Sequence, residues 1–199
     1  ARVLAGAALA VPDGAGLLLA SRWRGRPLRA RVTGVDLSRR LADLAARQRY
    51  QLFLLGAASG VAQRAADRLL SDHPGLQIAG VHAGSPDPAE EASIMRIIRA
   101  AAPQILLVAY GAPAQDKWIA RNLRRLGVPV CMGVGGLLDY LAGAVPYAPA
   151  WLRRLGLEWL YRLARQPRRW RRIWRAVVVF PWLVLTRGRR DAQNRDSKG

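Results

Sequence analysis

Short apolar runs alternate with amphipathic segments through the middle of the chain. Runs with the length and near-continuous hydrophobicity of strands that are covered on both faces lie at 7–10, 50–56, 76–81, 104–110 and 128–134. Amphipathic segments that predict helices lie at 36–48, 59–72, 89–101, 115–126 and 136–142. This alternation predicts an α/β, Rossmann-like domain in residues 1–150, with a mostly parallel sheet and helices on both faces.

The last quarter of the chain differs in charge from the rest. Residues 151–199 contain 14 Lys and Arg against 3 Asp and Glu, whereas residues 1–150 contain 18 against 10, and the whole chain has a formal net charge of +19. This asymmetry predicts an anionic partner for the C-terminal part: nucleic acid, phospholipid head groups or a pyrophosphate. We predict a basic, amphipathic helical appendage at 151–187, followed by a disordered tail at 188–199.

The appendage places tryptophans and arginines on adjoining faces of a helical wheel. One face, within about 60°, holds Trp159, Leu163, Trp170, Trp174 and Val177. The adjoining face, within about 80°, holds Arg162, Arg165, Arg169 and Arg172. The pattern is typical of a segment that lies in a membrane interface. The apolar run at 176–185 is too short to cross a bilayer, which takes roughly 20 residues. The residues expected to contact the membrane are Trp170, Trp174, Phe180 and Trp182.

That appendage has two alternative interpretations. A C-terminal helix could pack its tryptophans on the core and leave its arginines in water. Tryptophans interleaved with basic residues also occur in nucleic-acid-binding proteins. We expect no nucleic-acid partner, because the basic residues flank an apolar run and no helix-turn-helix, zinc-finger or RNA-binding strand motif is present.

Ligands of such folds bind where strands end and helices begin. Glycine-containing turns at these points lie at 11–16, 55–60, 111–118 and 134–139. Glycine lets backbone N–H groups approach a phosphate at a helix N-terminus, although it also serves ordinary turn geometry. There is no G-x-G-x-x-G after the first strand and no P-loop, which argues against a dinucleotide or ATP site.

Three carboxylates and one amide are candidates for chemistry. Asp13 follows an apolar run, where a general base would lie, or it caps the following helix. Gln115 could hydrogen-bond a sugar or uracil edge, whereas Asp116 and Asp139 suit structural roles at helix starts.

We expect no metal and no cofactor. His73 and His82 are isolated, Asp-x-Asp is absent, and the single Cys131 has the sequence context of a buried core residue in a reduced, cytoplasmic protein.

Several motifs, in this order, resemble the WecG/TagA/CpsF glycosyltransferases over roughly residues 5–175. They are VPDGAGLLLASR, RARVTGVDL, LFLLGAASGVAQRAADRL, GAPAQDKW, VGGLLDYLAGAVPYAPAWLRRLGLEWLYRL and QPRR. The resemblance implies a metal-independent, inverting enzyme of bacterial surface-polysaccharide or exopolysaccharide synthesis. It implies transfer of an N-acetylmannosamine-type sugar from UDP onto N-acetylglucosamine carried by undecaprenyl pyrophosphate. It also implies a peripheral position on the inner face of the cell membrane, and it allows a homo-oligomer.

The resemblance also assigns roles to residues. The base is Asp13, and the lipid pyrophosphate is bound by Arg162, Arg169 and Arg172. The substrate-binding residues are Arg31, Gly111, Pro113, Gln115, Gly135 and Gly136.

This chain departs from the family pattern in three places. Ala114 and Asp116 replace Lys and Glu of a Pro-Lys-Gln-Glu segment, and Tyr147 replaces the Arg of Arg-Ala-Pro. We also expect a preceding segment with the family's first strand and helix to be missing here. The donor sugar therefore stays open, including UDP-glucose or another UDP-hexosamine, and a non-catalytic membrane scaffold is a further alternative.

Overall fold

The structure is a computed structural model that describes residues 2–146, 148, 149, 152, 158–165, 170, 174, 179, 180, 182–184 and 186. The contacts within the chain group it into two compact units. The first consists of Ala1–Ala10 and Gly34–Pro146, and the second of Val11–Thr33 and Tyr147–Gly199. Residues 11–33 were expected in the first domain and instead group with the C-terminal segment.

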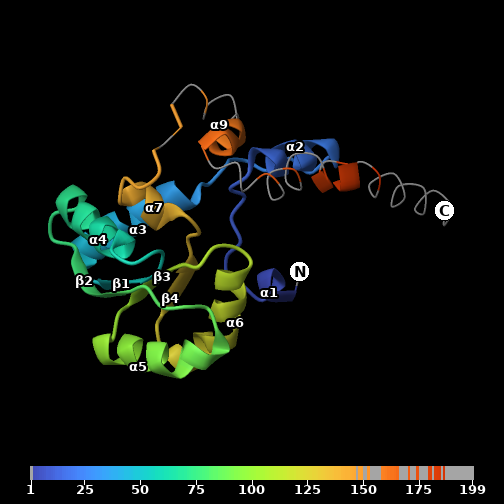
Figure 1. The fold of residues 1–199 in the computed structure, drawn as a ribbon. Coiled ribbons are helices and arrows are strands. Elements are labelled where there is room, and N and C mark those ends of the chain that lie inside the picture. Colours follow the sequence, from blue (N-terminus) through green and yellow to red (C-terminus); the bar gives the residue numbers. More distant parts are fainter. Residues whose placement is uncertain are drawn as a thin grey trace. The chain divides into compact units, whose positions relative to one another are not determined.

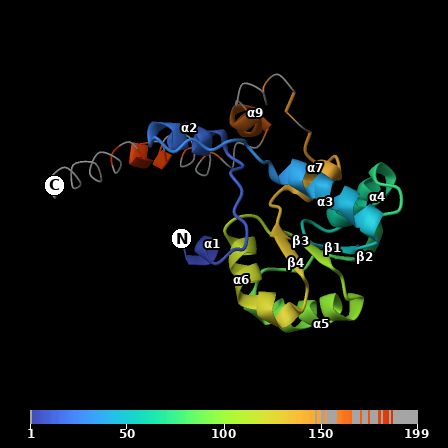
Figure 2. The ribbon, with the colours of Figure 1, turned by 180° about the vertical axis from the view of Figure 1, so that it is seen from behind.

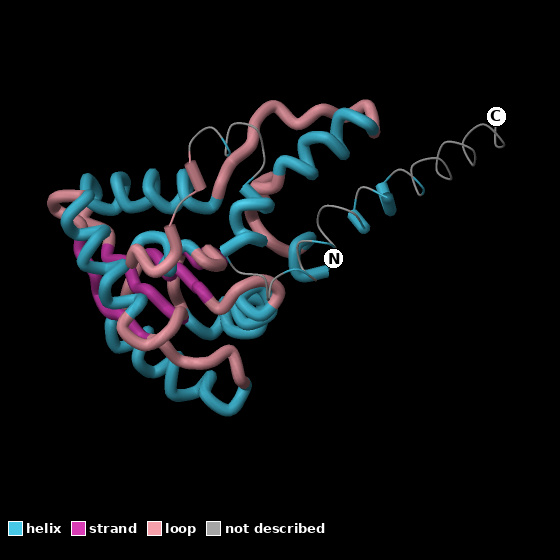
Figure 3. Tube along the Cα trace, turned by 45° about the horizontal axis from the view of Figure 1, so that its top comes forward, coloured by secondary structure: helices cyan, strands magenta, loops and turns pink. Residues whose placement is uncertain are grey.

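The first unit contains a parallel sheet, drawn in magenta in Figure 3. Within the described residues the sheet has four strands in the order β2-β1-β3-β4, and every neighbouring pair is parallel. The strands are β1 Gln51–Gly56, β2 Gln77–His82, β3 Ile105–Ala109 and β4 Val130–Gly133. Four of the five predicted strands are thereby confirmed, with ends that differ by no more than two residues.

Helices cover both faces of this sheet (Figures 1 and 2). One face carries α3 Gly34–Gln48, α4 Val61–Asp72 and α7 Leu137–Leu141. The other face carries α5 Glu91–Ala101, preceded by the 3-10 turn η1 Pro88–Glu90, and α6 Ala114–Leu126. All five predicted helices and the α/β fold class are confirmed.

Strand β1 shows why the apolar runs are continuous. Leu52 and Leu54 are buried against α3, α4 and α7, whereas Phe53 and Leu55 are buried against α5 and α6. Successive side chains of a strand point to opposite faces, so a strand covered on both faces requires apolar residues at every position.

The predicted strand at 7–10 is wrong. These residues form an exposed irregular segment, with Leu9 72% exposed, after the short helix α1 Arg2–Ala5, which packs against α6. Alanine occupies positions 7, 8 and 10. Alanine is depleted in strands and has little apolar surface to bury, so the hydrophobicity of this run alone wrongly predicted a strand.

The second unit contains α2 Ala15–Trp23 and α9 Glu158–Arg165. Helix α9 lies inside the predicted appendage, whereas the predicted disordered tail at 188–199 lies outside the described residues. Among the described residues, no helix combines the length and the apolar character that crossing a bilayer requires.

Candidate active site

The strand order creates a topological switch point between β1 and β3. Helix α4 leads from β1 to β2 on one face of the sheet, and α6 leads from β3 to β4 on the other face. The loops after β1 and β3 therefore separate at the carboxyl edge of the sheet. In folds of this kind ligands bind outside the carboxyl ends of the strands at such a point.

The backbone at this switch point is unusual. Gly56 ends β1 with φ +100, and a Cβ there would lie 2.9 Å from the carbonyl carbon of Ala109 at the end of β3. The next residue, Ala57, has φ +66, in the left-handed region that residues other than glycine seldom adopt. Strained backbone of this kind is concentrated at functional sites. The glycines of LGAASG pointed to this turn, but nothing in the sequence singled out Ala57.

Gln115 joins the loops that follow β3 and β4. Its Oε1 accepts hydrogen bonds from the backbone N–H of Gly111 at 3.1 Å and of Gly135 at 2.8 Å, and the residue is buried. Its Nε2 lies so close to Gly133 that a Cβ there would be 2.7 Å away. The predicted residues Gly111, Gln115 and Gly135 are thus brought together. The amide oxygen thus joins the two loops by accepting a hydrogen bond from each.

If Gln115 holds the two loops together, two substitutions should lower the free energy of unfolding by different amounts. Gln115→Met should lower the free energy of unfolding by about 2 kcal/mol or more, because two half-buried N–H groups lose their acceptor. Gln115→Glu keeps an acceptor in the same place and should lose less than Gln115→Met, because the two N–H groups offset part of the cost of burying a carboxylate. Urea unfolding followed by circular dichroism measures both. A Glu variant as unstable as the Met variant would contradict this role of Gln115.

The helices that start at this edge begin after a glycine or a proline. Gly60 precedes α4, whose first turn has no acidic residue, and a Cβ on Gly60 would lie 3.4 Å from Nη1 of Arg64. Pro113 and Gly136 occupy the N-cap positions of α6 and α7. A carboxylate oxygen of Asp139 lies beside Gly136, which agrees with a structural role at that helix start.

Four side-chain polar atoms in the described part of the chain are buried without a hydrogen-bond partner, and two of them lie close to the end of β3: the hydroxyl of Tyr110 and Nε1 of Trp118. Their rings meet edge to face, with centroids 6.0 Å apart. Burial, with a smaller contribution from the Glu90 carboxylate, raises the pKa of the Tyr110 hydroxyl well above its usual range. Burial likewise raises the pKa of the Cys131 thiol to about 11, so this thiol is protonated and unreactive at neutral pH.

Asp13 and Arg31 come together in the second unit. Nε of Arg31 donates to the backbone oxygen of Asp13 at 2.5 Å, and Nη2 lies 3.7 Å from the Asp13 carboxylate. The N-cap of α2 is Gly14 and has no side-chain cap, so the alternative that Asp13 caps this helix is wrong. The Asp13 side chain is 60% exposed, so its carboxylate is accessible to a substrate hydroxyl.

The predicted residues of the appendage are described only in part. Arg162 lies in α9, whereas Arg169 and Arg172 lie outside the described residues. Trp170, Trp174 and Trp182 are 55, 56 and 62% exposed, and Phe180 is half-buried.

Sequence reasoning missed the residue that holds the loop after β2. Arg121 of α6 pairs with Glu91 of α5, with Nε 2.7 Å from its carboxylate, and donates to the backbone oxygen of Pro86 at 3.1 Å. These contacts fix the loop beside the carboxyl edge of the sheet. An arginine on a polar helix face carries no signal of this in the sequence, because such residues usually face solvent.

The family described as "Glycosyl transferase WecG/TagA/CpsF family" matches residues 1–194. Three similar proteins share the name N-acetylglucosaminyldiphosphoundecaprenol N-acetyl-beta-D-mannosaminyltransferase. The one from Bacillus spizizenii strain W23 is 36% identical over 171 residues, which cover 86% of this chain and 66% of the relative. The one from Bacillus subtilis strain 168 is 33% identical over 184 residues, covering 92 and 70%.

The third relative, from Staphylococcus aureus strain MW2, is 32% identical over 176 residues, covering 87% of this chain and 67% of the relative. The chain thus spans about two thirds of the length of these relatives. The family match extends over nearly every residue, and it agrees with the resemblance seen in the sequence motifs. The chain therefore belongs to the WecG/TagA/CpsF family of glycosyl transferases.

Proposed function

We propose that this protein is an inverting, metal-independent glycosyltransferase. It moves an N-acetylmannosamine-type sugar from UDP onto N-acetylglucosamine linked to undecaprenyl diphosphate, in the synthesis of a bacterial surface polysaccharide. The names of the relatives support the sugar and the lipid-linked acceptor. The observation that carries the proposal is the exposed Asp13 carboxylate beside Arg31 at the start of α2.

In this reaction the Asp13 carboxylate accepts the proton of the acceptor hydroxyl while the hydroxyl oxygen attacks the anomeric carbon. The new glycosidic bond forms on the face opposite the bond to UDP. UDP departs with the electron pair of the broken bond, and the configuration of the carbon inverts. Arg31 holds the backbone of Asp13 and so orients the carboxylate.

The departing UDP gains negative charge that must be stabilised. We assign this role to backbone N–H groups in the first turns of α4, α6 and α7, other than those of Val61, Gln115 and Leu137, which donate to the preceding loops. These groups need no metal ion, in keeping with the absence of Asp-x-Asp from the sequence. We therefore expect EDTA to leave the activity unchanged.

The appendage is proposed to serve the acceptor. Arg162, Arg169 and Arg172 bind the lipid pyrophosphate by charge-assisted hydrogen bonds. The exposed rings of Trp170, Trp174 and Trp182 support contact with the membrane interface. The protein would then act peripherally on the inner face of the cell membrane, where its acceptor is located.

The test is UDP release from a panel of UDP-sugars, with and without a short-chain lipid pyrophosphoryl-N-acetylglucosamine acceptor in detergent. We expect release that depends on the acceptor, is greatest with one UDP-N-acetylhexosamine, and persists in EDTA. The anomeric configuration of the product, read by NMR, tests inversion. Release that is the same without acceptor, or none from any donor, would refute the proposal.

A further inference from the structure

Residues 12–32 fold into a hairpin of one helix and one irregular arm. The proposed function assigns roles only to Asp13 and Arg31 of this hairpin. At its base the backbone N–H of Val32 donates to the backbone oxygen of Pro12 at 3.1 Å, next to the bond between Arg31 and Asp13. One arm is α2, and the other is the irregular segment that returns to Val32. The two ends are thus tied together, and the tip lies at the C-terminus of α2.

The tip is folded by Ser21. Its hydroxyl donates to the backbone oxygen of Leu18 at 2.7 Å and accepts from the backbone N–H of Leu28 at 3.1 Å, while its backbone oxygen accepts from the N–H of Arg26 at 2.9 Å. Gly25, with φ +67, ends the helix in the left-handed conformation typical of a helix C-terminus. The tip is therefore an ordered turn rather than a loose loop.

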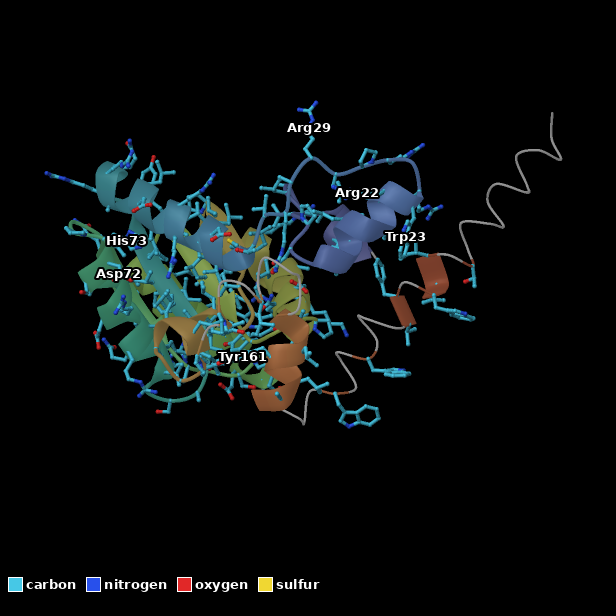
Figure 4. The ribbon with its side chains drawn as sticks, turned by 90° about the horizontal axis from the view of Figure 1, so that it is seen from above. Arg22, Trp23, Arg29, Asp72, His73 and Tyr161 are labelled. Carbon is cyan, nitrogen blue, oxygen red and sulfur yellow. The ribbon has the colours of Figure 1, made fainter. Side chains whose placement is uncertain are left out.

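This ordered tip presents cations and apolar side chains together. Every residue from 22 to 30 is exposed, with Trp23 53% and Leu28 44% exposed. Between residues 14 and 30 there are four arginines and no Asp or Glu. Figure 4 shows Arg22 and Trp23 at the end of α2 and Arg29 on the loop that follows, where the Arg29 side chain points away from the ribbon.

We propose that this tip binds an anionic phospholipid surface. Trp23 and Leu28 enter the interface, and Arg22, Arg26 and Arg29 contact the lipid phosphates. Tryptophan favours the head-group depth of a bilayer, and basic residues nearby are attracted to anionic lipids. The contact is separate from the one proposed for Trp170, Trp174 and Trp182, because a different segment of the chain makes it.

Two other occupants fit the tip less well. In a symmetric dimer through this surface, the same arginines would face each other and repel. A nucleic acid would bind the arginines but would leave the exposed Leu28 unused, since neither phosphates nor bases require an aliphatic contact. A lipid interface uses both kinds of side chain.

The first measurement places an environment-sensitive NBD fluorophore at the tip of the full chain. Leu28→Cys is labelled in a Cys131→Ala background, and Leu70→Cys on α4 serves as the control, because Leu70 is 43% exposed. With vesicles of pure phosphatidylglycerol, the label at 28 should shift to the blue and brighten, whereas the label at 70 should not. Vesicles of pure phosphatidylcholine should give a much smaller change.

A label at 28 that stays in water while the protein sediments with the phosphatidylglycerol vesicles would overturn the proposal. So would a failure to bind these vesicles at all. A blue shift without vesicles that grows with protein concentration would instead identify a second copy of the chain as the occupant. Because UDP release in detergent needs no vesicle, its outcome is independent of these measurements.

The second measurement removes the charges. The triple variant Arg22→Gln, Arg26→Gln, Arg29→Gln should weaken binding to phosphatidylglycerol vesicles on the order of 100-fold. The matched control is Arg64→Gln, Arg96→Gln, Arg124→Gln, which changes three exposed arginines of the first unit and leaves the same net charge. It should bind as the parent chain does. Equal losses in the two variants would show that net charge alone drives binding and would overturn the assignment to the tip.

Discussion

Asp13→Asn is expected to lower acceptor-dependent UDP release by about 1,000-fold, with little change in folding. An amide keeps the shape of the carboxylate but cannot take the proton of the attacking hydroxyl, and general base catalysis contributes roughly 100- to 10,000-fold. Arg31 donates to the backbone oxygen of Asp13, so that bond survives the substitution. The loss should appear in kcat more than in KM, because the proton moves only in the transition state.

Asp67→Asn is the matched control for this experiment. Asp67 is an exposed carboxylate on α4 that accepts a hydrogen bond from Gln63 at 3.0 Å, and an asparagine oxygen accepts the same bond. This variant should keep the parent rate. An Asp13→Asn enzyme that retained a tenth or more of the parent rate would show that another group is the base.

Trp118→Ala is expected to cost about 3–5 kcal/mol of the free energy of unfolding, the largest effect of any substitution considered in the first unit. The Trp118 side chain is fully buried between α6 and the sheet, so alanine leaves a large cavity. Urea unfolding followed by far-ultraviolet circular dichroism measures the loss, because it does not depend on tryptophan emission.

Trp118→Phe separates volume from polarity at this position. Phenylalanine keeps an aromatic ring near Tyr110 and removes Nε1, which has no hydrogen-bond partner among the described atoms. Leaving such a donor buried is itself unfavourable, so we expect this variant to lose less than about 2 kcal/mol. Equal losses for Phe and Ala would mean that Nε1 has a partner, such as an internal water.

The fold of the first unit could be predicted from the sequence because its central strands, β1 and β3, are buried on both faces. Each of these strands is a short, continuous apolar run. The helices between strands repeat their apolar residues with the period of an α-helix, so both kinds of element can be recognised in the sequence. The run at 7–10 has the same hydrophobicity but consists mainly of alanine, and hydrophobicity alone does not distinguish a buried strand from an exposed segment. The grouping of residues 11–33 with the C-terminal segment depends on contacts between distant parts of the chain, which local patterns do not contain.

The candidate active site could be predicted only in part. Glycine turns at the carboxyl edge located Gly111, Gln115 and Gly135, and the structure brings these three together. The sequence suggested that Gln115 would contact a substrate, but it could not show that its oxygen is already shared by two backbone N–H groups. For Asp13, two local interpretations were open, and only the position of the N-cap at Gly14 decided against one of them.

The hairpin of residues 12–32 sets the distance between the Asp13 carboxylate and the membrane. Asp13 lies just before α2 and the tip just after it, and the nine helical residues at 1.5 Å each account for about 14 Å of the distance between them. With the tip seated among lipid head groups, the carboxylate lies on the order of this distance from the membrane, or closer where the helix is tilted. The distance of the carboxylate from the membrane would then limit the acceptors that it can reach. A sugar one or two units from its lipid lies within this distance, whereas the end of a long glycan does not. One helical turn added to α2 would raise the carboxylate by up to about 5 Å and shift that limit toward longer acceptors.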